Sequence, residues 1–308
     1  MTQRRVLFGV SLGQWNGADI GNVPGVLKMA AEADRGGLDM FTIADHLYFG
    51  DKLDAYSTVG FALGQTAAIS GAVVVSNLPT RPAPALARTI TTLSALSGGR
   101  VILGIGAGAI WDMIPQLGIP RLTPGAAVIA MEEAITLIKS LCGGGEPVTF
   151  DGSFYQVGAL QPAPVAAPPI WTGSVGPKSL AVTGRHADGW VPSGGSDWLT
   201  ARYRESRPLI DEAAAAAGRD PAEIADIFNF GGRITQEPLA QTRGDDGRWI
   251  GGSPEQWIDE MTSAVLEHGA GGFVFRANPA DDTPAPVSVA RYAQEIVPAV
   301  REAVSKAS

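Results

Sequence analysis

Residues 41–47 read FTIADHL, an apolar run typical of a buried strand that stops at an acid and an imidazole. Stretches with helical spacing lie on both sides of it, at 24–35 and 55–68. A buried strand between two helices is the repeating unit of a parallel sheet, because each parallel strand needs a crossover to reach the next. The fold therefore depends on how often this unit recurs.

The unit recurs along the whole chain. Strand-like runs lie at 6–12, 39–44, 72–76, 101–105, 169–172, 188–192, 226–230 and 272–276. Helical stretches lie at 24–35, 55–68, 83–96, 124–141, 176–186, 197–217, 254–267 and 287–304. Eight such units predict a closed α/β barrel, the (β/α)8 TIM barrel, as a single domain over residues 1–308. An open, doubly wound sheet is the alternative, because one strand more or fewer would change the architecture.

Two segments interrupt the alternation, after strands four and seven. Residues 146–157, EPVTFDGSFYQV, alternate around Asp151-Gly152, which predicts a hairpin. Residues 235–252 are rich in Gly, Asp, Gln and Arg, which predicts an insertion that is a lid or a poorly ordered loop.

Composition limits the class of protein and its partners. The 308 residues are 45% hydrophobic and 18% charged, and no apolar run approaches the roughly 20 residues that cross a bilayer. The net charge of −8 argues against nucleic acid and anionic membranes as partners. The N-terminus shows no export signal, and Cys142 is the only cysteine, so we expect a cytoplasmic protein without a disulfide.

In a (β/α)8 barrel, catalytic groups lie on the rim formed by the carboxyl ends of the strands. This rule assigns the three histidines to different rims. His186 and His268 end helices just before a strand, which places them on the opposite rim. His46 directly follows a strand, and its neighbour Asp45, the Ser76-Asn77 pair after strand three and Asp112 after strand four map to the same rim. A hydrogen-bonded loop histidine is the simpler interpretation, but the convergence of polar residues on one rim favours His46 and Asp45 as a catalytic pair.

The stretch 169–180, PIWTGSVGPKSL, predicts an anion site. A strand ends at Gly173, a turn through Ser174, Val175 and Gly176 follows, and a helix begins with Pro177 and Lys178 in its first turn. Backbone N–H groups at such a helix start favour phosphate. A tight turn that needs glycine for its dihedral angles is the alternative.

GIGAG at 104–108 is not a dinucleotide fingerprint, because it lacks the G-x-G-x-x-G spacing. Small residues at Gly106, Ala107 and Gly108 would instead let a ring system approach the backbone. The sequence contains no Walker A motif, H-E-x-x-H, paired-cysteine metal site or G-x-S-x-G elbow, so we expect no metal and no hydrolase.

Four segments in order resemble the bacterial luciferase-like monooxygenase superfamily over nearly the whole chain. They are GLDMFTIADHL (37–47), RPAPALARTITTLSALSGGRVILGIGAG (81–108), PPIWTGSVGPKSLAVTGRHADGW (168–190) and GSPEQWIDEMTSAVLEHGAGGFVF (252–275). The resemblance implies a (β/α)8 barrel that binds FMN or the deazaflavin coenzyme F-420, with the cofactor phosphate on the Gly173–Lys178 loop. The Asp-His after the second strand is more similar to the deazaflavin branch.

That branch implies further features. The histidine matching His46 lies near the redox carbon and the substrate, and a non-prolyl cis peptide at Val74–Val75, followed by Ser76, lies beneath the deazaflavin ring. The resemblance also implies a homodimer. A basic track for an anionic coenzyme would draw on Lys178, Arg81, Arg233 and Arg276, although Arg81 could equally pair with a nearby acid.

Differences between this sequence and members of the family narrow the class of substrate. Members that oxidise a sugar phosphate carry a glutamate and a tryptophan where this chain has Ala109 and Gly50. Aromatic residues in rim loops favour an apolar or aromatic substrate instead: Trp15, Tyr48, Phe49, Trp111 and Trp198.

The resemblance thus implies an F-420-dependent oxidoreductase that moves a hydride between the deazaflavin C5 and a small carbonyl, imine or enone. His46 would move the accompanying proton, with its charge set by Asp45 and burial. An FMN-dependent monooxygenase supplied by a partner reductase and a non-catalytic flavin-binding barrel are the alternatives.

Overall fold

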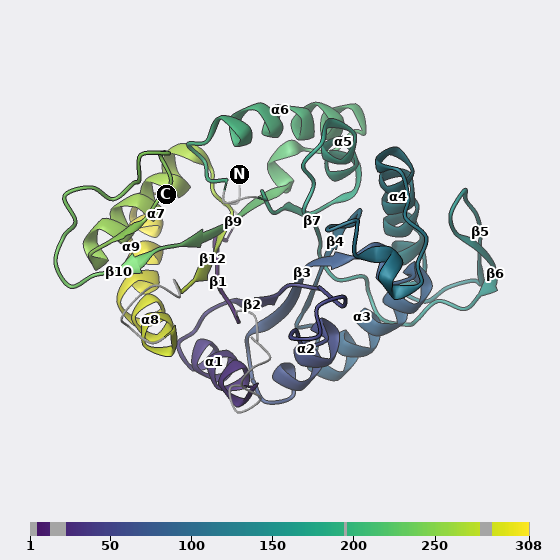
Figure 1. Ribbon diagram of the computed structural model, residues 1–308, viewed down its shortest axis with the longest axis horizontal. Coiled ribbons are helices and arrows are strands. Elements are labelled where there is room, and N and C mark those ends of the chain that lie inside the picture. The colour runs from purple at the N-terminus through teal and green to yellow at the C-terminus, as the bar shows by residue number, and fades with distance from the viewer. Residues whose placement is uncertain (1–4, 13–22, 194–195, 278–284, 308) are drawn as a thin grey trace.

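Eight parallel strands form a closed barrel in the computed structural model, which describes residues 5–12, 23–193, 196–277 and 285–307 (Figure 1). The strands are β1 (Leu7–Ser11), β2 (Met40–Ile43), β3 (Ser70–Asn77), β4 (Val101–Gly106), β7 (Ile170–Thr172), β8 (Gly189–Trp190), β9 (Ala225–Gly231) and β12 (Gly272–Arg276). They pair in chain order, and β12 closes the barrel by pairing with β1, with Leu7 opposite Gly272. The predicted barrel is confirmed, and the open sheet is wrong.

Helices surround the barrel, as Figure 1 shows. They are α1 (Val23–Arg35), α2 (Ala55–Leu63), α3 (Ala83–Ser97), α4 (Pro124–Ser140), α5 (Pro177–His186), α6 (Ala201–Ala216), α7 (Pro254–His268), α8 (Ala285–Arg291) and α9 (Val297–Ala307), the last two joined by a π-helical turn at Tyr292–Ile296. Local capping fixes several starts: Thr123 accepts a hydrogen bond from Ala126 N, and Ser253 and Gln256 form a capping box. None of the described helices is long and apolar enough to cross a membrane.

The core has two layers, because both faces of each strand are covered. A small cluster that includes Met40, Ile102 and Val274 comes from the strands, whereas Phe41 and Leu103 belong to the larger cluster shared with the helices. Neighbouring strand residues therefore pack into different layers, and the strands read as continuous apolar runs. This packing holds the strand ends, and so the site, in fixed positions.

The two insertions differ in how far they match expectation. The hairpin is confirmed as the antiparallel pair β5 (Val148–Asp151) and β6 (Gln156–Leu160). After strand seven, β10 (Arg233–Ile234) pairs with β11 (Gly251–Gly252). Between them Arg243 donates to Asp197 at 2.7 Å and pairs with Glu260, and Trp249 is buried. The segment is thus anchored, unlike the poorly ordered loop that its composition suggested; a lid role stays a prediction.

Candidate active site

A cavity of about 360 Å³ opens at the carboxyl ends of the barrel strands, within the usual size range of small-molecule sites. Its lining comes from β3, β4 and β9, from the loops that follow the strands, and from one residue each of α4 and α5. The lining residues are Ala44, Asp45, His46, Val74, Val75, Ser76, Asn77, Gly106, Ala107, Gly108, Ala109, Met131, Gly173, Ser174, Val175, Ser179, Val191, Ser193 and Asn229. Most of the predicted site residues are therefore brought together.

One wall of the cavity contains the Val74–Val75 peptide bond, which is cis as the resemblance implied. Pairing between β3 and β4 shifts register there, between Val73 and Ser76. Glycine leaves space for Val75 at the end of β4 and just after β7: a Cβ added at Gly106 would lie 2.7 Å from Val75 Cγ2, and one at Gly173 would lie 3.1 Å from it. These glycines thus make room for the Val75 side chain at the edge of the cavity.

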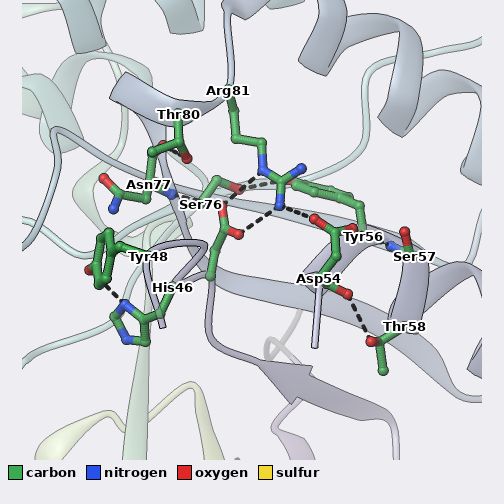
Figure 2. Close-up of polar contacts among 11 residues, drawn as sticks. His46, Tyr48, Asp54, Tyr56, Ser57, Thr58, Ser76, Asn77, Thr80 and Arg81 are labelled. Atoms are coloured by element: carbon green, nitrogen blue, oxygen red, sulfur yellow. Dashed lines mark hydrogen bonds and ion pairs between the residues drawn. The ribbon is translucent and has the colours of Figure 1, made fainter. Parts of the chain in front are cut away.

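Asp45 makes its hydrogen bonds to Arg81 and to the Asn77 backbone. It is 1% exposed and accepts hydrogen bonds from Arg81 Nε at 3.1 Å, Arg81 Nη2 at 2.8 Å and the Asn77 backbone N–H at 3.1 Å (Figure 2). Arg81 also pairs with Asp54. No hydrogen bond joins Asp45 to His46 among the described residues, so Asp45 acts on His46 through its charge. Arg81 is held by two acids, which confirms the alternative that it pairs with a nearby acid instead of joining a basic track.

His46 interacts with Tyr48 instead. Its Nδ1 lies 2.8 Å from the Tyr48 hydroxyl (Figure 2). This hydroxyl also donates to the Ala109 carbonyl at 3.4 Å. Burial lowers the pKa of His46, the Asp45 charge opposes this, and Lys52 lowers it further. The imidazole is consequently mostly neutral at pH 7.

Asn77 is the polar side chain in the cavity that most needs a ligand. It is 2% exposed, and neither Nδ2 nor Oδ1 has a hydrogen-bond partner among the described residues. Its backbone is fixed on both sides, because its N–H donates to Asp45 and its carbonyl accepts from the Thr80 hydroxyl at 2.8 Å. An unpaired buried amide costs about 1–3 kcal/mol. Sequence reasoning placed Asn77 on this rim but assigned it no role.

Some backbone N–H groups of the turn predicted to bind phosphate already make hydrogen bonds within the protein. Ser179 Oγ accepts hydrogen bonds from the backbone N–H groups of Val175 at 3.3 Å and Gly176 at 3.2 Å. Ser174 accepts from the Thr183 hydroxyl at 2.9 Å. Sequence reasoning did not single out Ser179. A serine at the third position of a helix that starts at a Gly-Pro pair is nevertheless a capping pattern. Pro177 and Lys178 are exposed and, with Gly176, lie outside the cavity lining.

Several predicted site residues lie elsewhere. Asp112, predicted to bind the cofactor, lies outside the cavity lining: its side chain is 88% exposed and pairs with Arg121, and the cofactor role stays a prediction. Trp111 packs over Gly108, where an added Cβ would lie 2.6 Å from the indole. Tyr48, Phe49 and Trp111 do not belong to the cavity lining, although Phe49 lies 6.0 Å from His46 between ring centroids. Trp15 lies outside the described residues.

Charge around the cavity is sparse. Asp45 and His46 are the titratable side chains of its described lining, which includes no lysine or arginine. In the described part of the chain, no group of three His, Cys, Asp or Glu side chains could hold a metal ion. The arrangement suits a neutral reacting group near His46.

Comparison with known proteins identifies the family to which this chain belongs. The sequence matches the luciferase-like monooxygenase family over residues 6–231. It is 33% identical over 205 residues to a 5,10-methylenetetrahydromethanopterin reductase of Methanolobus tindarius, covering 65% of this chain and 59% of that protein. An F-420-dependent glucose-6-phosphate dehydrogenase of Beutenbergia cavernae is 26% identical, with 90% and 93% covered. The chain thus spans about three fifths of the first relative but nearly all of the second.

Solved structures show the same fold. The coenzyme F-420-dependent tetrahydromethanopterin reductase of Methanopyrus kandleri superposes with a TM-score of 0.78 at 19% identity, over 96% of this chain and 99% of that one. The oxygenating constituent of 3,6-diketocamphane monooxygenase from Pseudomonas putida, in complex with FMN, gives 0.73 at 19% identity, over 95% and 98%. With its closed barrel and a sequence match over most of its length, the chain belongs to the luciferase-like monooxygenase family.

Proposed function

We propose that this protein is a coenzyme F-420-dependent oxidoreductase that acts on a small neutral carbonyl, imine or enone. The observation that carries the proposal is the cavity at the carboxyl ends of the strands, which His46 and the unpaired amide of Asn77 both line. Relatives named for F-420-dependent reductase and dehydrogenase activity support the same cofactor.

The residues present fit such a cofactor. Asn77 offers an unpaired donor and an unpaired acceptor to a ring that carries carbonyl and N–H groups. The turn at Ser174 and Val175, beside the start of α5, suits a phosphate. Lys178 is exposed in the first turn of that helix and adds positive charge beside the turn.

His46 would move the proton that accompanies the hydride. When bound, the deazaflavin would supply or accept a hydride at its C5. Neutral His46 can take the hydroxyl proton of an alcohol, and protonated His46 can return a proton to the oxygen of a carbonyl. Because the pKa of His46 is lowered, the base form dominates at pH 7 and reduction should quicken as the pH falls.

The substrate is proposed to be neutral and largely apolar. The described lining of the cavity contains no lysine or arginine that would hold a phosphorylated or carboxylated substrate. Ala109 lines the cavity where sugar-phosphate-oxidising members carry glutamate, and the rings of Tyr48 and Phe49 pack edge to face near His46. A small ketone or enone matches this environment better than a sugar phosphate.

Ligand titration tests the proposal. Purified protein is titrated separately with F-420 and with FMN while ligand fluorescence is followed. We expect F-420 to bind with a Kd in the micromolar range or below, about −8 kcal/mol, and FMN to bind more weakly. Binding of FMN alone, with oxygen consumption in the presence of a reductase, would establish the monooxygenase alternative that the FMN complex of the camphane monooxygenase favours.

Replacing His46 tests the proton role. We expect H46A to lower kcat about 10²- to 10⁴-fold and to leave the Kd of F-420 nearly unchanged, because proton transfer is lost and the cofactor contacts remain. The matched control is H186Q, since His186 bonds Glu132 at 2.9 Å at the end of α5, away from the cavity. Full turnover in H46A would refute the assignment.

A further inference from the structure

His46, Tyr48 and Ala109 form a hydrogen-bonded row beside the cavity. The Tyr48 oxygen lies 2.8 Å from His46 Nδ1 and 3.4 Å from the Ala109 carbonyl oxygen. A carbonyl only accepts, so a hydroxyl proton directed at Ala109 leaves the Tyr48 oxygen free to accept from Nδ1. Both contacts are satisfied at once only when Nδ1 carries a proton.

We propose that Tyr48 is a positioning residue that holds His46 in the Nδ1–H tautomer, so that the bare Nε2 exchanges the proton with the substrate. The catalytic role of this tautomer rests on the proposed function. When Nε2 takes a proton, Nδ1–H keeps donating to Tyr48, and the hydroxyl keeps donating to Ala109. The row therefore supports His46 before and after proton transfer, and no proton leaves Tyr48. In the opposite arrangement Nε2 would already carry its proton and could accept none.

The loop that carries the row is held in place at both ends. Arg81 pairs with Asp45 just before His46 and with Asp54 at the start of α2 (Figure 2). Within the loop the Phe49 N–H donates to the His46 carbonyl at 3.1 Å. The Phe49 ring also packs edge-on against Tyr48 at 4.9 Å. Such a loop keeps the hydroxyl facing Nδ1.

Burial and neighbouring charges keep the row mostly neutral at pH 7. Asp45 raises the pKa of His46, but burial and Lys52 lower it. Arg81 neutralises Asp45, and Asp51 pairs with Lys52 at 2.8 Å. Burial and the Asp45 charge raise the pKa of Tyr48, and the nearby Asn77 side chain opposes them in part. Its hydroxyl thus stays protonated, as the row requires.

Nitrogen-15 NMR of histidine-labelled protein tests the tautomer without any cofactor. The chain has three histidines, so the loss of one signal set in H46Q identifies His46. In the wild-type protein above the His46 pKa, we expect a protonated Nδ1 and an unprotonated Nε2. In Y48F the acceptor is lost, so Nε2–H should become the main form and the pKa of His46 should fall by roughly half to one unit.

The matched control is Y155F, which removes a hydroxyl from a half-buried tyrosine of the β5–β6 connection and should leave the His46 signals unchanged. A wild-type Nε2–H tautomer, or the same tautomer and pKa in Y48F, would overturn the proposal. With F-420 bound, the pH profile of kcat should shift in Y48F by the same amount as the His46 pKa. Failure of F-420 to bind would refute the proposed function separately, because the NMR result needs no turnover.

Discussion

At the scale of single residues, two buried polar side chains near the cavity differ sharply. Asp45 accepts three hydrogen bonds, two of them from Arg81, whereas the Asn77 amide has no hydrogen-bond partner among the described residues. Both are almost fully buried. The first side chain stabilises the fold, and the second is a cost that a bound ligand can offset.

Replacing Asn77 by leucine should therefore have opposite effects on stability and binding. N77L removes an unpaired buried amide, so the free energy of unfolding of the ligand-free protein should rise by about 1 kcal/mol. The Kd of F-420 should increase about tenfold, because one charge-neutral hydrogen bond is lost. Urea unfolding and fluorescence titration measure the two effects. Lower stability with unchanged binding would mean that the amide has a partner within the protein.

The lowered pKa of His46 makes stability depend on pH. Folding brings this pKa below its ordinary value of 6.5, so the unfolded chain binds the proton more readily than the folded one. The contribution of His46 is fully favourable above pH 6.5 and is lost as the pH falls through the folded pKa. Relative to wild type, H46Q should gain stability between pH 7.5 and pH 5, as measured by urea unfolding. A constant difference would contradict the lowered pKa.

At the scale of elements, Arg81 joins segments that are distant in sequence. It follows β3 and binds acids at both ends of the loop between β2 and α2, and its guanidinium also lies 5.2 Å from the centre of the Tyr56 ring. The Tyr56 hydroxyl in turn lies 2.6 Å from Ser76 Oγ in the cavity wall. One cation thus orders the loop that carries His46 and the strand end that carries Asn77.

Removing this cation should be costly. R81M leaves Asp45 buried without its charge partner, which costs about 3–5 kcal/mol when one side of a buried pair is lost. The double variant D45N/R81M should recover a large part of this, because the amide oxygen can still accept from Asn77 N–H. Unfolding free energies of the wild type, two single variants and the double variant form the cycle. Additive losses would show that the pair is uncoupled.

At the scale of the whole molecule, the barrel is closed by its first and last strands. β1 pairs with both β2 and β12, and α9 packs against α7 on the outside. Residues close to the two ends of the described chain are therefore part of one core. The expected homodimer and cytoplasmic location stay predictions.

A closed barrel with one shared core should unfold as a single unit. We expect one thermal transition, with the calorimetric enthalpy equal to the van't Hoff enthalpy. The reason is that breaking the pairing between the first strand, β1, and the last strand, β12, opens the barrel and exposes the shared core. Differential scanning calorimetry at several protein concentrations measures this and also reports any dimer, whose transition shifts with concentration. Two separate transitions at all concentrations would show independent domains.

The sequence by itself determined the eight strands, their order and the rim on which His46 lies, because local hydrophobic period and strand-helix alternation are properties of neighbouring residues. The Val74–Val75 cis peptide followed from family resemblance. Only the tertiary structure decided that Asp45 binds Arg81 instead of His46, that Asp112 faces solvent, that Ser179 fills part of the phosphate turn and that Asn77 lacks a partner. The reason is physical: a buried polar group bonds whatever the packing of distant segments brings within about 3 Å, and no local pattern encodes that choice.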